Sequence, residues 1–185
     1  MDKTVFDSAA FVSIDMTSGR ISTPGRDELA LIPNAILALV PIGDALNRAA
    51  NGWGENHGRV LAERLTVDDV GVEALSSHLG GTLAALGMGR VLVEIRHHAL
   101  VFRLTGGPHD DIAETNAAIL GGFLTGYLGA VSGHPFAVLD LGLHGRDRLF
   151  WAGNPDAVDQ ARRAIENGDA PLAVIDALTR GDALC

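Results

Sequence analysis

The sequence has very little cysteine and very little lysine. Of its 185 residues, one is a cysteine, Cys185, and one is a lysine, Lys3. A single cysteine excludes an intramolecular disulfide and a zinc site built from paired cysteines. The first residues also lack the long apolar stretch of a signal peptide. These absences predict a protein of the reducing cytoplasm.

The chain also lacks basic runs and long apolar runs. Its formal net charge is −9 and its arginines are scattered, so we expect no nucleic-acid partner. The charge-free stretch from Ala117 to Gly133 is shorter than the roughly 20 residues that a membrane span prefers. Glycine, serine and threonine are frequent in it. It therefore predicts a helix buried inside the protein and no transmembrane segment.

No complete catalytic or cofactor motif is present. The sequence contains no phosphate-binding loop, no dinucleotide fingerprint, no His-Glu-x-x-His and no Gly-x-Ser-x-Gly. We therefore assign no catalytic residue, no metal ligand and no definite cofactor, and favour a protein that is not an enzyme. Gly122 and Gly126 are four residues apart in a helical pattern, which favours close helix packing over phosphate binding.

What the sequence does contain is the composition of a globular protein. Apolar residues make up 47% and charged residues 20% of it, which predicts a single domain over residues 1–185. An N-terminal hairpin, built from residues 10–15 and 20–23, forms an extension over 1–26. The core should span 33–151, and helices should follow in 152–185. The glycines of residues 51–54 predict a kink or a break in the helix that follows Pro41.

Within this core, one pattern occurs twice. Helical spacing is followed by two strands at residues 91–95 and 99–104, and again by two strands at 136–143 and 148–151. A doubled helix–hairpin unit predicts an α+β fold, in which helices pack against one face of a four-stranded antiparallel sheet.

The histidines and aromatic residues are the candidates for functional chemistry. His97 and His98 at a hairpin tip, and His109 before two aspartates, fit a solvated turn and a helix cap, with metal binding as the alternative for each. His57 and His78 lie at the margins of apolar stripes, as core histidines do. If the protein is an enzyme, His57 is the first candidate for an acid–base group.

Two further groups of residues have both a structural and a functional interpretation. Glu94 and Arg103 would be diagonal neighbours on paired strands, and a cross-strand ion pair explains them without catalysis. Trp53, Phe102, Phe123 and Tyr127 are either ordinary core residues or the lining of an apolar pocket. The residues alone leave both alternatives open for the aromatic group.

Three segments resemble a known family. They are GENHGRVLAERL at 54–65, LAALGMGRV at 83–91, and ILGGFLTGYL at 119–128 followed by SGHP at 132–135. Together they resemble the 4-vinyl-reductase-like domain, whose fold is that of the TRAPP vesicle-tethering proteins. Unlike that family, the last hairpin, residues 141–150, has no cysteine pair.

We expect a homodimer, because helical surfaces rich in glycine and alanine allow the close approach of a second copy. The resemblance implies a non-enzymatic domain that binds or senses a small hydrophobic molecule, such as a lipid or a tetrapyrrole-like compound. The ligand-binding residues would be Trp53, His57, Phe102, Phe123 and Tyr127. Residues 83–108 are more weakly similar to a non-catalytic accessory protein of cellulose synthase. That similarity implies the alternative of a self-assembling cytoplasmic scaffold or accessory component.

Overall fold

The computed structural model of the chain describes residues 13–15, 20–22, 28–29, 41–64, 72–85, 88–96, 99–106 and 113–180. His97, His98, His109 and Cys185, and with them the alternative of metal binding at these histidines, lie outside the described residues. The helices are α2 (Asp44–Arg64), α3 (Val72–Ala85), α4 (Ala113–Ser132), α5 (Pro155–Glu166) and α6 (Pro171–Arg180). The strands of the main sheet are β4 (Arg90–Arg96), β5 (Ala99–Thr105), β6 (Ala137–His144) and β7 (Asp147–Gly153).

The predicted doubled unit is confirmed. Helix α3 precedes the hairpin β4–β5, helix α4 precedes the hairpin β6–β7, and all neighbouring strands are antiparallel in the order β4-β5-β7-β6. Gly145 has a φ of +69° in the turn where His144 pairs with Asp147, a conformation that glycine adopts without strain. The sheet is therefore an open one, with β4 and β6 at its edges.

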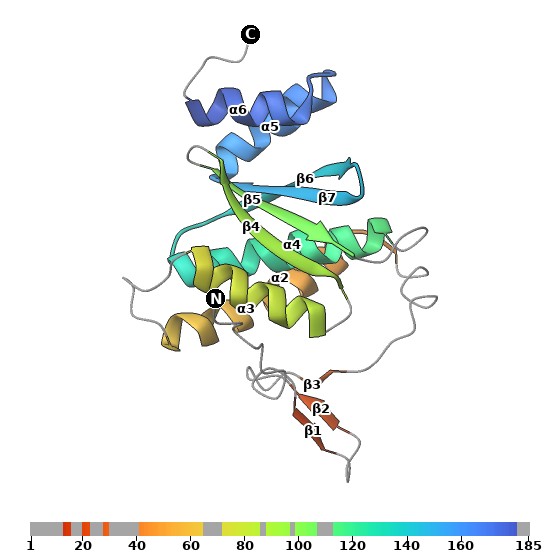
Figure 1. Cartoon of the computed structure of the whole chain (residues 1–185), viewed down its shortest axis with the longest axis vertical. Coiled ribbons are helices and arrows are strands. Elements are labelled where there is room, and N and C mark those ends of the chain that lie inside the picture. The colour runs from red at the N-terminus through yellow and green to blue at the C-terminus, as the bar shows by residue number, and fades with distance from the viewer. Residues whose placement is uncertain are drawn as a thin grey trace, which may run out of the picture.

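The N-terminal strands form a separate small sheet. β1 (Ser13–Asp15) pairs with β2 (Arg20–Ser22), with Ile14 opposite Ile21, which confirms the predicted hairpin. A third strand that the sequence did not indicate, β3 (Glu28–Leu29), pairs with the other side of β2. In Figure 1 this sheet lies at the end of the molecule opposite α5 and α6.

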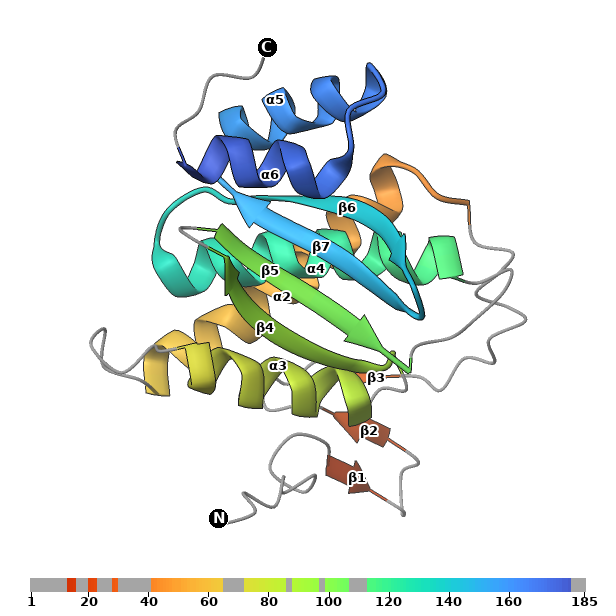
Figure 2. The ribbon, with the colours of Figure 1, turned by 45° about the horizontal axis from the view of Figure 1, so that its top comes forward.

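Helices cover both faces of the main sheet, so the expectation of one covered face was wrong. Figure 2 shows α2, α3 and α4 on one side and α5 and α6 on the other. Along β5 the side chains alternate between the two layers: Phe102 and Leu104 belong to the core beneath α2, α3 and α4, and Ala99 and Val101 to the core beneath α5 and α6. Two apolar cores therefore sandwich the sheet.

Helices α2 and α4 pack so closely that their backbones touch. A Cβ atom at Gly54 would overlap the carbonyl oxygen of Phe123, and one at Gly126 would overlap that of Asn51. Helix α2 runs through these glycines without a break, so of the two predicted outcomes at residues 51–54, a kink or a break, the break was wrong. The contact with α4 offsets the roughly 1 kcal/mol that each glycine costs a helix.

Helix α4 is the buried helix that its apolar composition predicted. Its inward side chains are largely inaccessible; they are Ala117, Leu120, Phe123, Leu124, Tyr127 and Leu128. None of the helices in the described ranges combines the length and the hydropathy that a membrane span requires.

Candidate functional site

Aromatic side chains from α2 and α4 meet at the centre of the larger core. Trp53 and His57 are one turn apart on α2, and Phe123 lies against both, with ring centroids 4.5 Å from Trp53 and 5.9 Å from His57. The rings of Trp53 and His57 meet edge-on at 5.6 Å. The close approach of the two helices at their glycines brings these rings together. We call this group, with Phe102 and Tyr127, the aromatic cluster.

Tyr127 joins the cluster to α3. Its ring stacks on Phe123 at 5.7 Å, and its hydroxyl lies 2.9 Å from Nδ1 of His78. Burial raises the pKa of the Tyr127 hydroxyl far above its ordinary value. The phenol therefore stays neutral over the physiological pH range and remains able to hydrogen-bond.

The remaining member of the cluster comes from the sheet. Phe102 on β5 is fully buried in the same core as Phe123 and Tyr127. All five residues predicted to bind a ligand thus border one apolar core. Trp53 alone among them is only partly buried, which places it at the margin of the core.

This layer of the molecule also contains buried polar atoms without a hydrogen-bond partner. In the part of the chain that the structure describes, they include Nε1 of Trp53 and Oγ1 of Thr82. Thr82 lies on α3 and is only 3% exposed. A buried unpaired polar group costs about 1–3 kcal/mol, so native proteins contain few of them. Thr82 could not be identified from the sequence, because a threonine in a helical apolar pattern carries no distinguishing signal.

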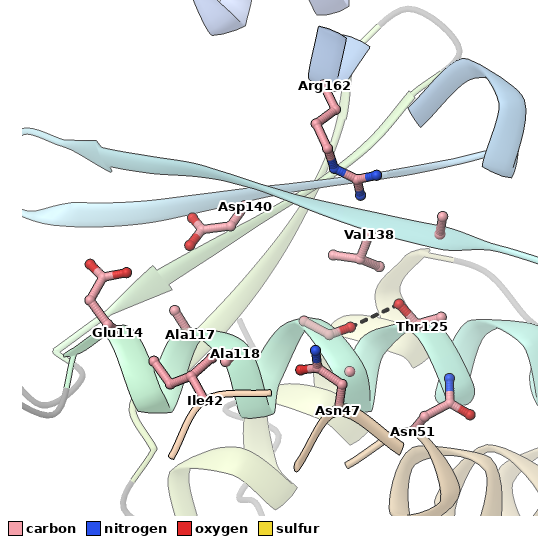
Figure 3. A pocket seen from close by; sticks show the side chains of 13 residues that line it. Ile42, Asn47, Asn51, Glu114, Ala117, Ala118, Thr125, Val138, Asp140 and Arg162 are labelled. Carbon is pink, nitrogen blue, oxygen red and sulfur yellow. Dashed lines mark hydrogen bonds between the residues drawn. The ribbon is translucent and has the colours of Figure 1, made fainter. Parts of the chain in front are cut away.

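A groove lies on the other side of the α2–α4 pair, against β6 (Figure 3). Its larger part has a volume of about 460 Å³ and is bordered by Ile42, Asn47, Ala118, Gly121 and Val138, among others. A second part of about 430 Å³ shares Asn51 and Thr125 with the first. Neither part is lined by a member of the aromatic cluster.

An ion-pair network closes one end of this groove. The guanidinium of Arg148 on β7 is held by Asp140 on β6 and by Glu114 in the first turn of α4, with 2.9 Å from each terminal nitrogen to a Glu114 oxygen. A hydrogen bond from Arg148 lowers the pKa of the Glu114 carboxyl. Since Arg148 is only 8% exposed and its bonds reach two other elements, the network ties the start of α4 to the sheet.

The remaining candidates, a histidine and an ion pair, both have structural settings. His57 is 3% exposed, packed between aromatic rings and outside both parts of the groove, which is the closed setting expected of a structural histidine. The cross-strand ion pair is confirmed, with Arg103 Nε 2.7 Å from Glu94 Oε1. The described residues contain no group of three or more side chains suited to hold a metal ion.

Known proteins were compared with the chain by sequence and by structure. No family model and no curated protein matches the chain. Among solved structures, it is similar to the phenol-responsive sensory domain of the transcription activator PoxR, solved with phenol, at 15% identity and a TM-score of 0.52, over 82% of this chain and 91% of that one. It also matches a vinyl-4-reductase family protein from Methanocaldococcus jannaschii at 14% identity and a TM-score of 0.41, over 68% and 83% of the two chains.

The likeness to the sensory domain shows a shared fold. The resemblance that the sequence motifs predicted is thereby confirmed at the level of the fold. The weaker resemblance to the cellulose synthase accessory protein gains no support from these matches.

Proposed function

We propose that the protein is a non-enzymatic sensory domain that binds a small apolar molecule within the aromatic cluster of Trp53, His57, Phe102, Phe123 and Tyr127. The observation that carries this proposal is the convergence of aromatic rings from α2, α4 and β5 in one core, beside buried polar atoms that have no partner among the described residues. Ligand sites of this kind are mostly apolar, with a few polar groups that orient the ligand.

The shared fold supports the same proposal. A domain with this architecture, that of PoxR, is phenol-responsive and was solved with phenol, so the fold can hold a small aromatic molecule. The rings of the cluster are already in contact, so the proposed ligand is small, with one or two rings. A lipid or a tetrapyrrole-like compound would need a larger opening.

Entry of the ligand requires a side chain that can move. Trp53 fits this role because it is partly exposed, whereas Phe123 and Tyr127 are fully buried. Rotation of the indole away from Phe123 would open the cluster toward solvent without parting the α2–α4 contact. Such a gate keeps the apolar site closed when it is empty.

The proposal is tested with a variant in which Trp53 is the single tryptophan. The chain has two tryptophans, so Trp151→Phe leaves Trp53 as the only indole emitter. Titration with toluene should change its emission in a saturable manner and raise the melting temperature. Native mass spectrometry of the purified wild-type protein tests for a retained lipid or tetrapyrrole.

A groove-blocking variant serves as the control. Gly121→Leu places a large side chain in the groove, where a Cβ atom meets no described atom within 4 Å. Toluene binding should survive this change. Loss of binding in Gly121→Leu would assign the ligand to the groove, and the absence of saturable binding in both proteins would refute the proposed function.

We further propose that the protein acts as a cytoplasmic homodimer. The small residues along the groove, among them Gly121 and Gly129, allow the close approach of a second copy, and a symmetric dimer is the simplest closed assembly. Light scattering at high micromolar concentration tests this, since a monomer there would contradict it. Rings or filaments would favour the scaffold alternative.

A further inference from the structure

Thr82 and Trp53 carry polar atoms that the described part of the chain leaves without partners. The hydroxyl of Thr82 and the indole N–H of Trp53 are buried, and neither has a hydrogen bond to any described residue. Threonine in a helix commonly bonds to a carbonyl one turn earlier, as Thr125 does to Gly121 at 2.9 Å. The Thr82 hydroxyl makes no such bond within its own helix, so it remains available to another acceptor or donor.

Two side-chain hydrogen bonds across the core place Thr82 level with Phe123. They align α3 with α4 in antiparallel fashion: His78 bonds to Tyr127, and Asn116 near the start of α4 donates to the carbonyl of Met88, three residues beyond the end of α3. Thr82 is one turn beyond His78 on the same side of α3, and Phe123 is one turn before Tyr127 on α4. Thr82 is therefore level with Phe123.

Trp53 reaches the same ring from the α2 side. Its ring centroid lies 4.5 Å from that of Phe123. The two polar groups thus border the aromatic cluster from two different helices. The indole nitrogen can only donate a hydrogen bond, whereas the hydroxyl can donate and accept.

We propose that Thr82 and Trp53 select a ligand that carries an oxygen hydrogen-bond acceptor on an apolar ring. This inference rests on the proposed function and names the chemical class that the same site prefers. A hydroxyl or a carbonyl oxygen satisfies the N–H of Trp53 and the hydroxyl of Thr82, while a hydrocarbon leaves both unpaired. The ligand-free protein already carries the free-energy cost of two unpaired polar groups. Hydrogen bonds from these groups to the oxygen of the ligand therefore add directly to affinity.

The experiment compares three probes that each carry one benzene ring: toluene, phenol, which has the same number of heavy atoms as toluene, and the somewhat larger acetophenone. In the wild type, phenol or acetophenone should bind about five- to tenfold more tightly than toluene, from one net hydrogen bond. Tighter binding of phenol indicates a hydroxyl ligand, and tighter binding of acetophenone indicates a carbonyl ligand. Equal affinity of all three overturns the inference but leaves the proposed function intact, whereas no binding of any probe overturns both.

Variants of Thr82 separate an effect on ligand preference from an effect on the stability of the fold. Thr82→Val replaces the hydroxyl with a methyl group of similar volume, so the ligand-free protein should melt about 2–4 °C higher. The same change should remove most of the preference for the oxygen-bearing probe and leave the affinity for toluene unchanged. Thr82→Ser, which keeps the hydroxyl, should keep the preference.

Two further variants complete the test. Trp53→Phe should also reduce the preference, because it removes the second donor while keeping an aromatic ring. Thr125→Val is the matched control, since its hydroxyl bonds to Gly121 and faces the groove. A preference that persists in both Thr82→Val and Trp53→Phe, or that falls equally in Thr125→Val, overturns the assignment.

Discussion

The hydroxyl of Tyr127 lies 2.9 Å from Nδ1 of His78, and this bond joins α4 to α3 across the core. The two residues are 49 positions apart in the chain. A buried pair of this kind fixes how two helices meet, because each partner would lose its hydrogen bond if the helices moved apart. Because Tyr127 is the single tyrosine of the chain, tyrosine absorbance reports on this part of the core.

We predict that Tyr127 ionises only when the protein unfolds. Burial raises its pKa in the folded state above the ordinary value near 10, so the folded state holds its proton at a pH where the unfolded state has lost it. The contribution of Tyr127 to stability is therefore complete below about pH 10 and is lost as the pH rises above it. Absorbance at the tyrosinate band and circular dichroism should change together in an alkaline titration. Tyrosinate absorbance that appears while the helical signal is intact would contradict this.

The ion-pair network at the end of the groove predicts how the stability of the protein changes at acid pH. The hydrogen bond from Arg148 lowers the pKa of Glu114 in the folded state. The contribution of Glu114 to folding stability is therefore present above its unfolded pKa near 4.3 and is lost as the pH falls below that value. Glu114→Gln should therefore flatten the fall in stability at acid pH. Urea unfolding at pH 3 to 7 measures it. Asp159→Asn is the control, because its pair with Arg162 is about half exposed, and it should leave the profile unchanged.

Replacement of the central arginine should have a larger effect. Arg148→Met removes hydrogen bonds to two carboxylates from a nearly buried position, and we expect a loss of about 1.5–3 kcal/mol in the free energy of unfolding. Urea unfolding at neutral pH measures the loss. A change within experimental error would show that the network does not hold α4 against the sheet.

Local patterns in the sequence predicted much of this structure. The hairpins follow from alternating apolar residues, and the start of α5 follows from Asn154, whose side chain accepts a hydrogen bond from Asp156, with Pro155 in the first turn. The five residues of the aromatic cluster were also identified, because ring-bearing side chains at helical spacing, and Phe102 in the alternating pattern of a strand, point to the core. Whether they bind a ligand remains a prediction.

Features that depend on distant contacts were not predictable. Propensity alone favours a break at the glycines of α2, and only the approach of α4 explains why the helix continues. The face of the sheet that α5 covers depends on packing that an amphipathic pattern does not specify. Thr82 has no local signature at all; its importance comes from the absence of a hydrogen-bond partner among the described residues.

The two kinds of helical glycine in α4 give the sharpest stability prediction. Gly126 and Gly121 are in the same helix, but a Cβ atom at Gly126 would overlap the backbone of Asn51, whereas one at Gly121 meets no described atom within 4 Å. Gly121→Ala should stabilise the protein by about 0.5–1 kcal/mol, because alanine favours the helix. Gly126→Ala should destabilise it by more than about 2 kcal/mol, because α2 and α4 must separate along their whole contact. Urea unfolding of both variants measures the difference. If the two alanines shift stability in the same direction by similar amounts, the backbone contact between α2 and α4 does not exist in solution.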